Sequence, residues 1–314
     1  MTFYLRGIAV SCSIFVAFYS VLSLAVCCVW RKIWQFSQRY STERSADLLF
    51  AVRIAPFVAA TVVTLAIAVP SFLLLEPRAI DEKMSGLSIF LALSGIAVVG
   101  AGIWRAAAAS ARVSRAIACW SSHANVIEPS LFRGSGNALP VLRVSALAPP
   151  LTVSGILRST LWLSRAAEFA LSEQELETAL RHEMVHVRRR DNLRKLFLHF
   201  VAFPGMTQLE IAWHEATEMV ADEAAVSSEY EALDLAEAMI KLSQISLHPS
   251  TEPTTVLAKR VMRLMAWSKR RQTATEVGWL ECSACVGAAT VAMLVVAYGQ
   301  LLVKMHEATE FLVR

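Results

Sequence analysis

Four long apolar stretches limit what this chain can fold into. They cover about residues 7–30, 54–75, 87–104 and 277–303, and the first three contain no charged residue. A helix of about 20 apolar residues crosses the hydrocarbon core of a bilayer. Backbone N–H and C=O groups find no water there, so each spanning segment must satisfy them within a helix. We therefore predict a mainly α, multi-pass membrane protein with four transmembrane helices.

The first apolar stretch has a competing interpretation as a signal peptide. Only Arg6 precedes it, and Trp30, Arg31 and Lys32 follow it where a cleavage site would carry small residues. The apolar run is also longer than a typical signal core. We therefore expect this stretch to be retained as a membrane helix.

Basic residues gather at particular ends of the apolar stretches. The loop expected between the first two stretches carries Arg31, Lys32, Arg39, Arg44 and Arg53, and the chain beyond the third carries Arg105, Arg112 and Arg115. The loop 76–83 is mixed in charge. The positive-inside rule then places the first loop and everything after Trp104 in the cytoplasm. The predicted domains are a three-helix region 1–106, a cytoplasmic domain 107–276, the fourth helix, and an extracytoplasmic tail 304–314.

Composition agrees with a membrane protein and excludes one class of partner. The chain is 55% hydrophobic and 18% charged, with a formal net charge of +4. Anionic lipid attracts basic residues beside membrane segments, and no basic patch is interleaved with aromatic residues as in a nucleic-acid interface. We expect the lipid bilayer as a partner and no nucleic acid. All cysteines except Cys119 lie in or beside predicted membrane helices, and we expect Cys282 and Cys285 to pack there rather than bind metal.

One short motif predicts chemistry. His182, Glu183 and His186 form His-Glu-x-x-His. Residues four apart share one face of a helix, so both imidazoles can bind a single Zn²⁺ ion. Glu183 lies beside the first ligand, where its carboxylate can act as a general base. Independently of the motif, a capping box of Ser172 and Glu175 and an apolar face predict this helix.

A catalytic zinc site needs a third protein ligand. A second predicted helix, about 208–228, places Glu218 and Asp222 on one face among alanines. We expect Glu218 to be the ligand and Asp222 to accept a hydrogen bond from a ligand imidazole. His214 is the rival ligand, and a plain acidic solvent face is the alternative to a site. His199 would point away from the metal on a continuous helix.

Local patterns predict the rest of the domain. Residues 105–127 should continue the third apolar stretch as a helix. Short β-prone runs follow at 139–145, 151–155 and 160–164. Strands before a zinc helix can bind an extended substrate at a sheet edge or simply cover the core, and both interpretations stay open. We expect residues 188–190 to be a solvated basic stretch, Asp191 to cap the next helix, and 192–203 to lean on the membrane.

The two motifs together resemble the gluzincin metallopeptidases. The closer resemblance is to the BlaR/MecR-type antibiotic-sensor peptidases of the bacterial cytoplasmic membrane. It is carried by residues 175–191 and 218–226, and more weakly by 258–264. The resemblance covers about 140–303 in sequence and the whole chain in topology. It implies an α+β gluzincin-like zinc peptidase domain inserted between the third and fourth membrane helices.

The same resemblance implies roles for individual residues. His182, His186 and Glu218 would be zinc ligands, so Glu218 is preferred to His214. Glu183 would be the general base, and Asp222 would support the site.

For function, the resemblance implies a zinc metalloendopeptidase that cleaves a cytoplasmic or membrane protein, such as a transcriptional repressor, in regulated proteolysis. HtpX-type proteases of membrane quality control share the same site and give one alternative. A non-catalytic membrane scaffold with structural zinc is another. The chain departs from the family in two ways. It ends at Arg314, so we expect no extracellular sensor domain, and residues 203–209 are less apolar than their counterpart.

Overall fold

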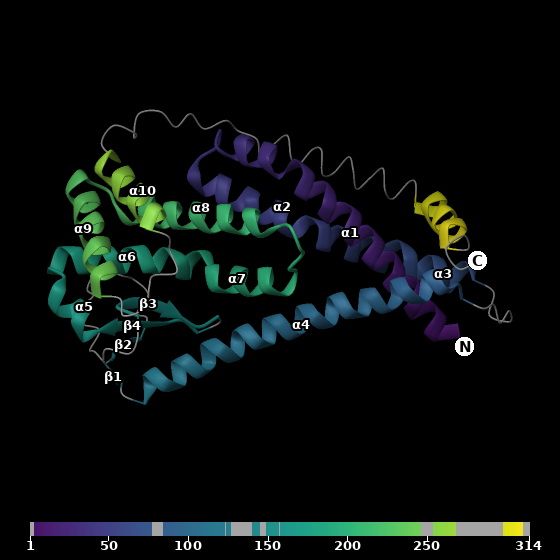
Figure 1. Ribbon diagram of the computed structural model, residues 1–314, viewed down its shortest axis with the longest axis horizontal. Helices are drawn as coiled ribbons and strands as arrows, with labels where there is room; N and C mark the ends of the chain where they lie inside the picture. Colours follow the sequence, from purple (N-terminus) through teal and green to yellow (C-terminus); the bar gives the residue numbers. More distant parts are fainter. Residues whose placement is uncertain are drawn as a thin grey trace.

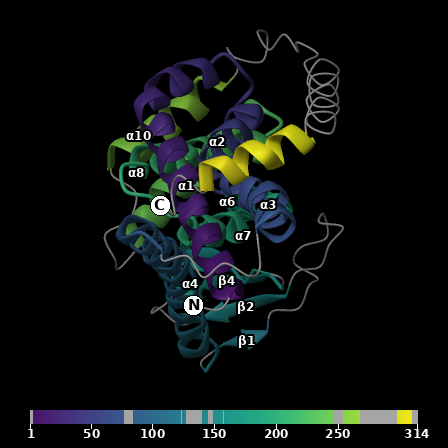
Figure 2. The same ribbon diagram turned by 90° about the vertical axis from the view of Figure 1, so that its right-hand side faces the viewer.

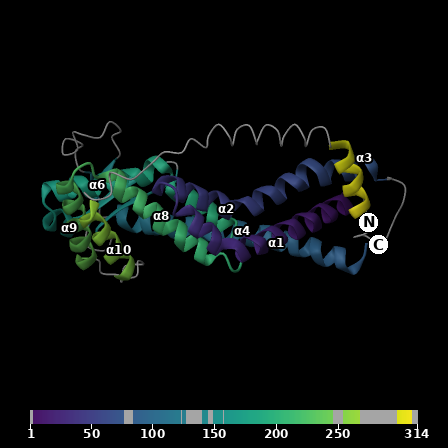
Figure 3. The same ribbon diagram turned by 90° about the horizontal axis from the view of Figure 1, so that it is seen from above.

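The computed structural model describes residues 3–76, 84–122, 124–126, 140–144, 149–156, 158–245, 254–267 and 298–309. The protein is elongated and mainly helical, with long helices running between its two ends (Figures 1 and 3). One end holds the N-terminus and the helix formed by residues 298–309. The other end holds a small sheet surrounded by shorter helices.

Three helical segments are long and apolar enough to cross a membrane. They are α1 (Phe3–Ser37), the continuous run of α2 (Thr42–Val63), η1 (Thr64–Ala68) and α3 (Val69–Leu75), and α4 (Gly86–Ser121). The first three apolar stretches are thus confirmed as helices of membrane-spanning length. The loop predicted over 31–53 is wrong, because only residues 38–41 lie between α1 and α2. Hydropathy marks where a helix stops being apolar, not where it ends.

A π-helical turn precedes a proline in the second of these segments. Pro70 has no N–H, so an α-helix would leave the carbonyl of Ala66 without its usual donor. η1 ends at Ala68, two positions before Pro70, and the Tyr298 hydroxyl donates a hydrogen bond of 2.7 Å to the Ala66 carbonyl. A residue far along the chain therefore satisfies a backbone group that the proline would otherwise leave exposed to an apolar environment.

The helix over 298–309 lies against α3 at the end of the bundle (Figure 2). Ser71 Oγ also donates a hydrogen bond of 2.9 Å to the carbonyl of Leu302. This helix continues past residue 303, where the predicted fourth membrane helix was expected to end. Residues 277–297 of that prediction lie outside the described residues.

A four-stranded sheet begins the region beyond α4. Its strands are β1 (Asn125–Val126), β2 (Val141–Val144), β3 (Leu151–Ser154) and β4 (Thr160–Ser164), in the order β1-β2-β4-β3. β4 pairs in parallel with β2 and antiparallel with β3, which forms an edge. The three β-prone runs are confirmed as strands over 141–144, 151–154 and 160–164. The helix predicted over 105–127 ends at Ser121, and residues 125–126 form β1, so that prediction is wrong beyond the end of α4. Leu161 and Leu163 pack with Ala167 of α5 (Arg165–Ala170) and Leu180 of α6 (Glu173–Arg189).

The remaining helices are α7 (Asp191–Phe200), α8 (Thr207–Ala225), α9 (Glu229–Ile245) and α10 (Thr254–Met265). α8 lies alongside both α2 and α6, and α7 lies against α4. Gly102 of α4 permits the contact between α7 and α4, because a Cβ there would lie 2.5 Å from the Phe200 carbonyl oxygen. The segment expected to lean on the membrane packs against α4, a helix of membrane-spanning length.

The turn between α7 and α8 is fastened to the bundle through one carbonyl. The Val201 carbonyl accepts hydrogen bonds from Tyr19 Oη (2.7 Å) and from Arg53 Nη1 (3.0 Å). Arg53 also donates from Nη2 to Glu210 of α8 at 2.6 Å. Arg53 is only 1% exposed. Arg53 was predicted to lie in a basic loop, whereas it is a buried residue of α2.

The end of α6 is likewise attached to α2. Arg189 lies 2.8 Å from Glu43 and 2.8 Å from Asp47, and Arg194 of α7 lies 2.7 Å from Asp47. The prediction of a solvated basic stretch over 188–190 is therefore wrong for Arg189. Its carboxylate partners lie on α2, which is so far away in the sequence that no local pattern predicted the contact.

Candidate metal centre

Local signals fix the helix that carries the first two site residues. Ser172 Oγ accepts a hydrogen bond from the Glu175 N–H (3.3 Å), and the Glu175 carboxylate accepts one from the Ser172 N–H (2.8 Å). This is the predicted capping box. Lys241 of α9 pairs with Glu175 at 2.6 Å. The anchored start sets the rotation of α6, which points His182 and His186 towards α8.

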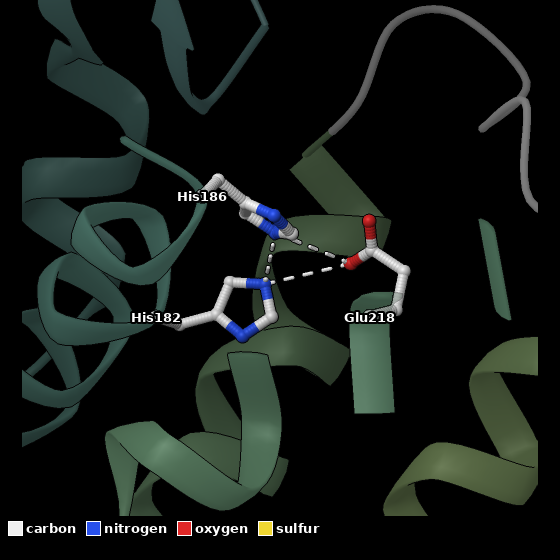
Figure 4. Close-up of side chains that lie close together, drawn as sticks. All are labelled: His182, His186 and Glu218. Atoms are coloured by element: carbon white, nitrogen blue, oxygen red, sulfur yellow. Dashed lines mark hydrogen bonds and ion pairs between the residues drawn. The ribbon is translucent and has the colours of Figure 1, made fainter. Parts of the chain in front are cut away.

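Small side chains let α8 approach α6 closely. Ala221, which neighbours Asp222, is fully buried and belongs to the same hydrophobic cluster as Val185 of α6, so a small side chain lies near the contact between the two helices. Glu218 then reaches both imidazoles (Figure 4). Its Oε2 lies 3.5 Å from His182 Nε2 and 3.7 Å from His186 Nε2. The two Nε2 atoms are 3.3 Å apart.

These three ligand atoms fit a zinc ion. Bonds of about 2.0–2.1 Å in tetrahedral geometry separate neighbouring ligand atoms by about 3.3–3.4 Å. The separations of 3.3, 3.5 and 3.7 Å are close to that value. Two imidazole nitrogens and a carboxylate oxygen at these distances repel one another unless a proton or a cation lies between them. Three protein ligands also leave one tetrahedral position for water or substrate, as catalytic zinc sites do.

A carboxylate orients His186. Asp191 Oδ2 lies 2.7 Å from His186 Nδ1, which leaves Nε2 to face the other ligand atoms. Asp191 is fully buried at the start of α7. Arg190 has a left-handed backbone (φ 55°), and this turn folds Asp191 back onto α6. From the sequence, Asp191 was expected only to cap the next helix. The sequence does show an acidic residue five positions after the second histidine. Whether its carboxylate reaches the imidazole, however, depends on the turn at Arg190.

Asp222 lies beside the other imidazole. Its Oδ1 is 3.0 Å from His182 Nδ1. The two atoms lie close enough for an ion pair, but the contact lacks the geometry of a hydrogen bond. Asp222 therefore sits where the sequence analysis expected a residue that orients a ligand.

Arg260 of α10 completes the surroundings of the site. Its Nε and Nη2 donate to the Asp222 carboxylate at 2.8 and 2.7 Å, and Nη1 lies 3.2 Å from Glu218 Oε2. Arg260 lies in the segment 258–264, whose weak family resemblance predicted no role for it. Its nearest carboxylate partner is 38 residues away, on another helix, so no local pattern could reveal the contact.

Three other residues that the sequence offered as candidates lie outside the triad of possible metal ligands. His214 Nδ1 lies 3.9 Å from Glu218 Oε1, and His214 is not part of the triad. Burial lowers the pKa of His214, and nearby Lys195 lowers it further. His199 is exposed on α7. Glu183 is half-buried on α6, next to the ligand pair, and its charge contributes to the field at His186.

Burial and charge act in opposite directions on the triad. Burial lowers the pKa of His182, but Asp222 and Glu218 outweigh it and raise that pKa. Burial also lowers the pKa of His186, yet Asp191 and Glu218 raise it to about 10. Burial raises the pKa of Glu218, but the two imidazoles hold it well below its usual range. The site thus favours positive charge at its centre, which a proton or a metal ion can supply.

The fold and site together define a membrane-type helical protein with a candidate His-His-Glu metal centre. Comparison of the chain with models of known protein families finds no match, and comparison with curated proteins finds none either. The motifs and the geometry are therefore the evidence for function.

Proposed function

We propose that this protein is a membrane-embedded zinc metallopeptidase. The observation that carries the proposal is the approach of Glu218 to His182 and His186 at zinc-ligand separations. The sequence spacing His-Glu-x-x-His followed by Glu-x-x-x-Asp supports the same conclusion, because it is the gluzincin pattern. Structural zinc sites are usually closed by four protein ligands, whereas this triad has three and a neighbouring Glu183.

Each residue has a role in the proposed reaction. His182, His186 and Glu218 would hold the ion, and Asp191 and Asp222 would orient the imidazoles. When bound, zinc acts as a Lewis acid and promotes the ionisation of water. Glu183 would accept the proton of the water that attacks the scissile carbonyl. It would then deliver that proton to the leaving amine as the peptide bond breaks.

The topology and motifs support a substrate class. We infer regulated cleavage of a cytoplasmic or membrane protein, such as a transcriptional repressor, on the basis of the resemblance to BlaR/MecR-type peptidases. The peptidase region would face the cytoplasm of a bacterial cell. Quality-control proteolysis of the HtpX type remains the alternative within the same chemistry.

The first prediction concerns Glu183→Gln. Glutamine keeps the shape of the side chain but cannot accept the proton, so zinc binding should be retained and proteolysis lost. A general base contributes about 10²–10⁴-fold to the rate. Quantitative proteomics of cells with the wild type or the variant should reveal cleavage products that disappear in the variant. Glu177→Gln, an exposed residue of the same helix, is the matched control.

A different outcome would reject catalysis. If Glu183→Gln leaves the same cleavage products and supports every cellular function of the wild type, the protein is a zinc-bearing scaffold. If the wild type binds no zinc, the proposal of a zinc site is wrong.

A further inference from the structure

A buried arginine stands behind the metal triad. Arg260 is 7% exposed, and charged side chains are rarely buried unless they are paired. It extends from α10 to α8, where Nε lies 2.8 Å from Asp222 Oδ2 and Nη2 lies 2.7 Å from Asp222 Oδ1. The remaining nitrogen, Nη1, lies 3.2 Å from Glu218 Oε2. All three guanidinium nitrogens thus contact carboxylates of the site.

The oxygens that Arg260 contacts are the ones that face the histidines. Asp222 Oδ1 is the atom 3.0 Å from His182 Nδ1. Glu218 Oε2 is the atom that faces the Nε2 atoms of both imidazoles. A guanidinium is a planar fork, so bidentate pairing fixes the plane of a carboxylate as well as its position. Arg260 therefore orients one carboxylate that aims a ligand and another that is itself a ligand.

We propose that Arg260 is a positioning residue of the metal centre. It holds Asp222 and Glu218 in the orientation in which His182 Nε2 and Glu218 Oε2 face the same ion. This proposal rests on the proposed function, because it takes that ion to be zinc. The metal centre would then depend on α10 as well as on α6 and α8, the two helices that carry the sequence motifs.

Arg260 has two opposing effects on a bound dication. Its positive charge repels zinc, which would weaken binding. Its removal, however, leaves Asp222 as a buried charge without its bidentate partner, and such charges are costly. Asp222 can relieve that cost by turning away from His182. Loss of groups that orient metal ligands weakens affinity by about 10–100-fold, so orientation should outweigh repulsion.

The test compares zinc affinity among four full-length proteins in detergent, measured by competition with a chelator. They are the wild type, Arg260→Met, Arg260→Lys and Arg263→Met. Arg260→Met should bind zinc about 10–100-fold more weakly. Arg260→Lys keeps the charge but not the fork, so it should recover only part of the loss. Arg263 lies one turn further along α10 and contacts Glu223 and Thr42 rather than the triad, so its variant should stay within about twofold of the wild type.

A double variant separates positioning from a general structural effect. If Arg260 acts chiefly by holding Asp222, then adding Arg260→Met to Asp222→Asn should weaken zinc binding by less than the roughly 10–100-fold lost in Arg260→Met alone, since only the contact with Glu218 is left to lose. The double variant leaves no unpaired buried charge at this position. It therefore preserves the comparison if Arg260→Met alone fails to give a single species in size-exclusion chromatography.

Two results would overturn the proposal. One is an Arg260→Met protein that binds zinc as tightly as the wild type or more tightly. The other is a double variant whose losses multiply. If the wild type binds no zinc, the proposed function fails and this proposal fails with it. If the wild type binds and cleaves while Arg260→Met keeps its affinity, only the positioning role is lost.

Discussion

At the scale of residues, the site is a cluster of charges that are compatible only around a cation. Glu218, Asp191 and Asp222 surround two imidazoles whose pKa values they raise. Each histidine has its Nδ1 beside a carboxylate, so both present Nε2 to the same point. This arrangement orients a ligand before the metal arrives, which is what carboxylates behind metal-binding histidines do.

The second prediction concerns Asp191, whose contact with a ligand imidazole was not predicted from the sequence. Asp191→Ala removes the acceptor 2.7 Å from His186 Nδ1, so the imidazole should lose its fixed orientation. Zinc affinity should fall by about 10–100-fold. Asn192→Ala is the neighbouring control, because Asn192 donates to the carbonyls of Val153 and Gly155 and not to a ligand. Equal zinc affinity in both variants would show that Asp191 serves only the start of α7.

The third prediction is a pH dependence of zinc binding. The metal-free His186 has a pKa raised to about 10, and the pKa of His182 is also raised. At neutral pH the metal-free site therefore holds protons that must leave when zinc binds. Below those pKa values, affinity should weaken about tenfold per pH unit for each proton released. Calorimetry in buffers of different ionisation enthalpy would measure the release, and an affinity unchanged between about pH 8 and about pH 6 would contradict it.

At the scale of elements, what could be predicted depended on the range of the interactions involved. Long apolar runs and the capping box at Ser172 are local, so the helices and the pairing of His182 with His186 followed from the sequence. Arg53 was misplaced because its partner Glu210 is 157 residues away. Arg260 went unassigned because its carboxylates lie on another helix. Asp191 is close in sequence, but a left-handed residue decides where it points.

The fourth prediction tests the attachment of α8 to the bundle. Arg53→Met removes the donor to the Val201 carbonyl and the partner of Glu210. The lost buried hydrogen bonds should lower the free energy of unfolding by about 1–3 kcal/mol. Thermal unfolding in detergent measures this as a lower Tm. Arg39→Met, an exposed residue between α1 and α2, is the control, and an equal Tm for both variants would mean that the attachment contributes nothing.

At the scale of the whole molecule, the metal centre and the helix over 298–309 lie at opposite ends of the long helices (Figures 1 and 3). α1 leads from the far end to the site end, the α2–α3 run returns, and α4 leads to the site end again. If each of these three helical runs crosses a bilayer, the N-terminus and the candidate metal centre lie on different sides of it. The positive-inside rule, applied to the basic residues near the metal centre, predicts that this centre faces the cytoplasm.

The last prediction concerns this orientation. In a background without other cysteines, Cys119 at the exposed end of α4 should react with a membrane-impermeant maleimide only after cells are permeabilised. Glu307→Cys, at an exposed position of the helix over 298–309, should react in intact cells. Gln38→Cys, between α1 and α2, should behave like Cys119, because both lie at the site end of the helices. Labelling of Cys119 and Glu307→Cys from the same side would mean that the long helices do not carry the chain across the bilayer. Labelling from opposite sides but with the order reversed would keep the three crossings and overturn only the cytoplasmic placement of the metal centre.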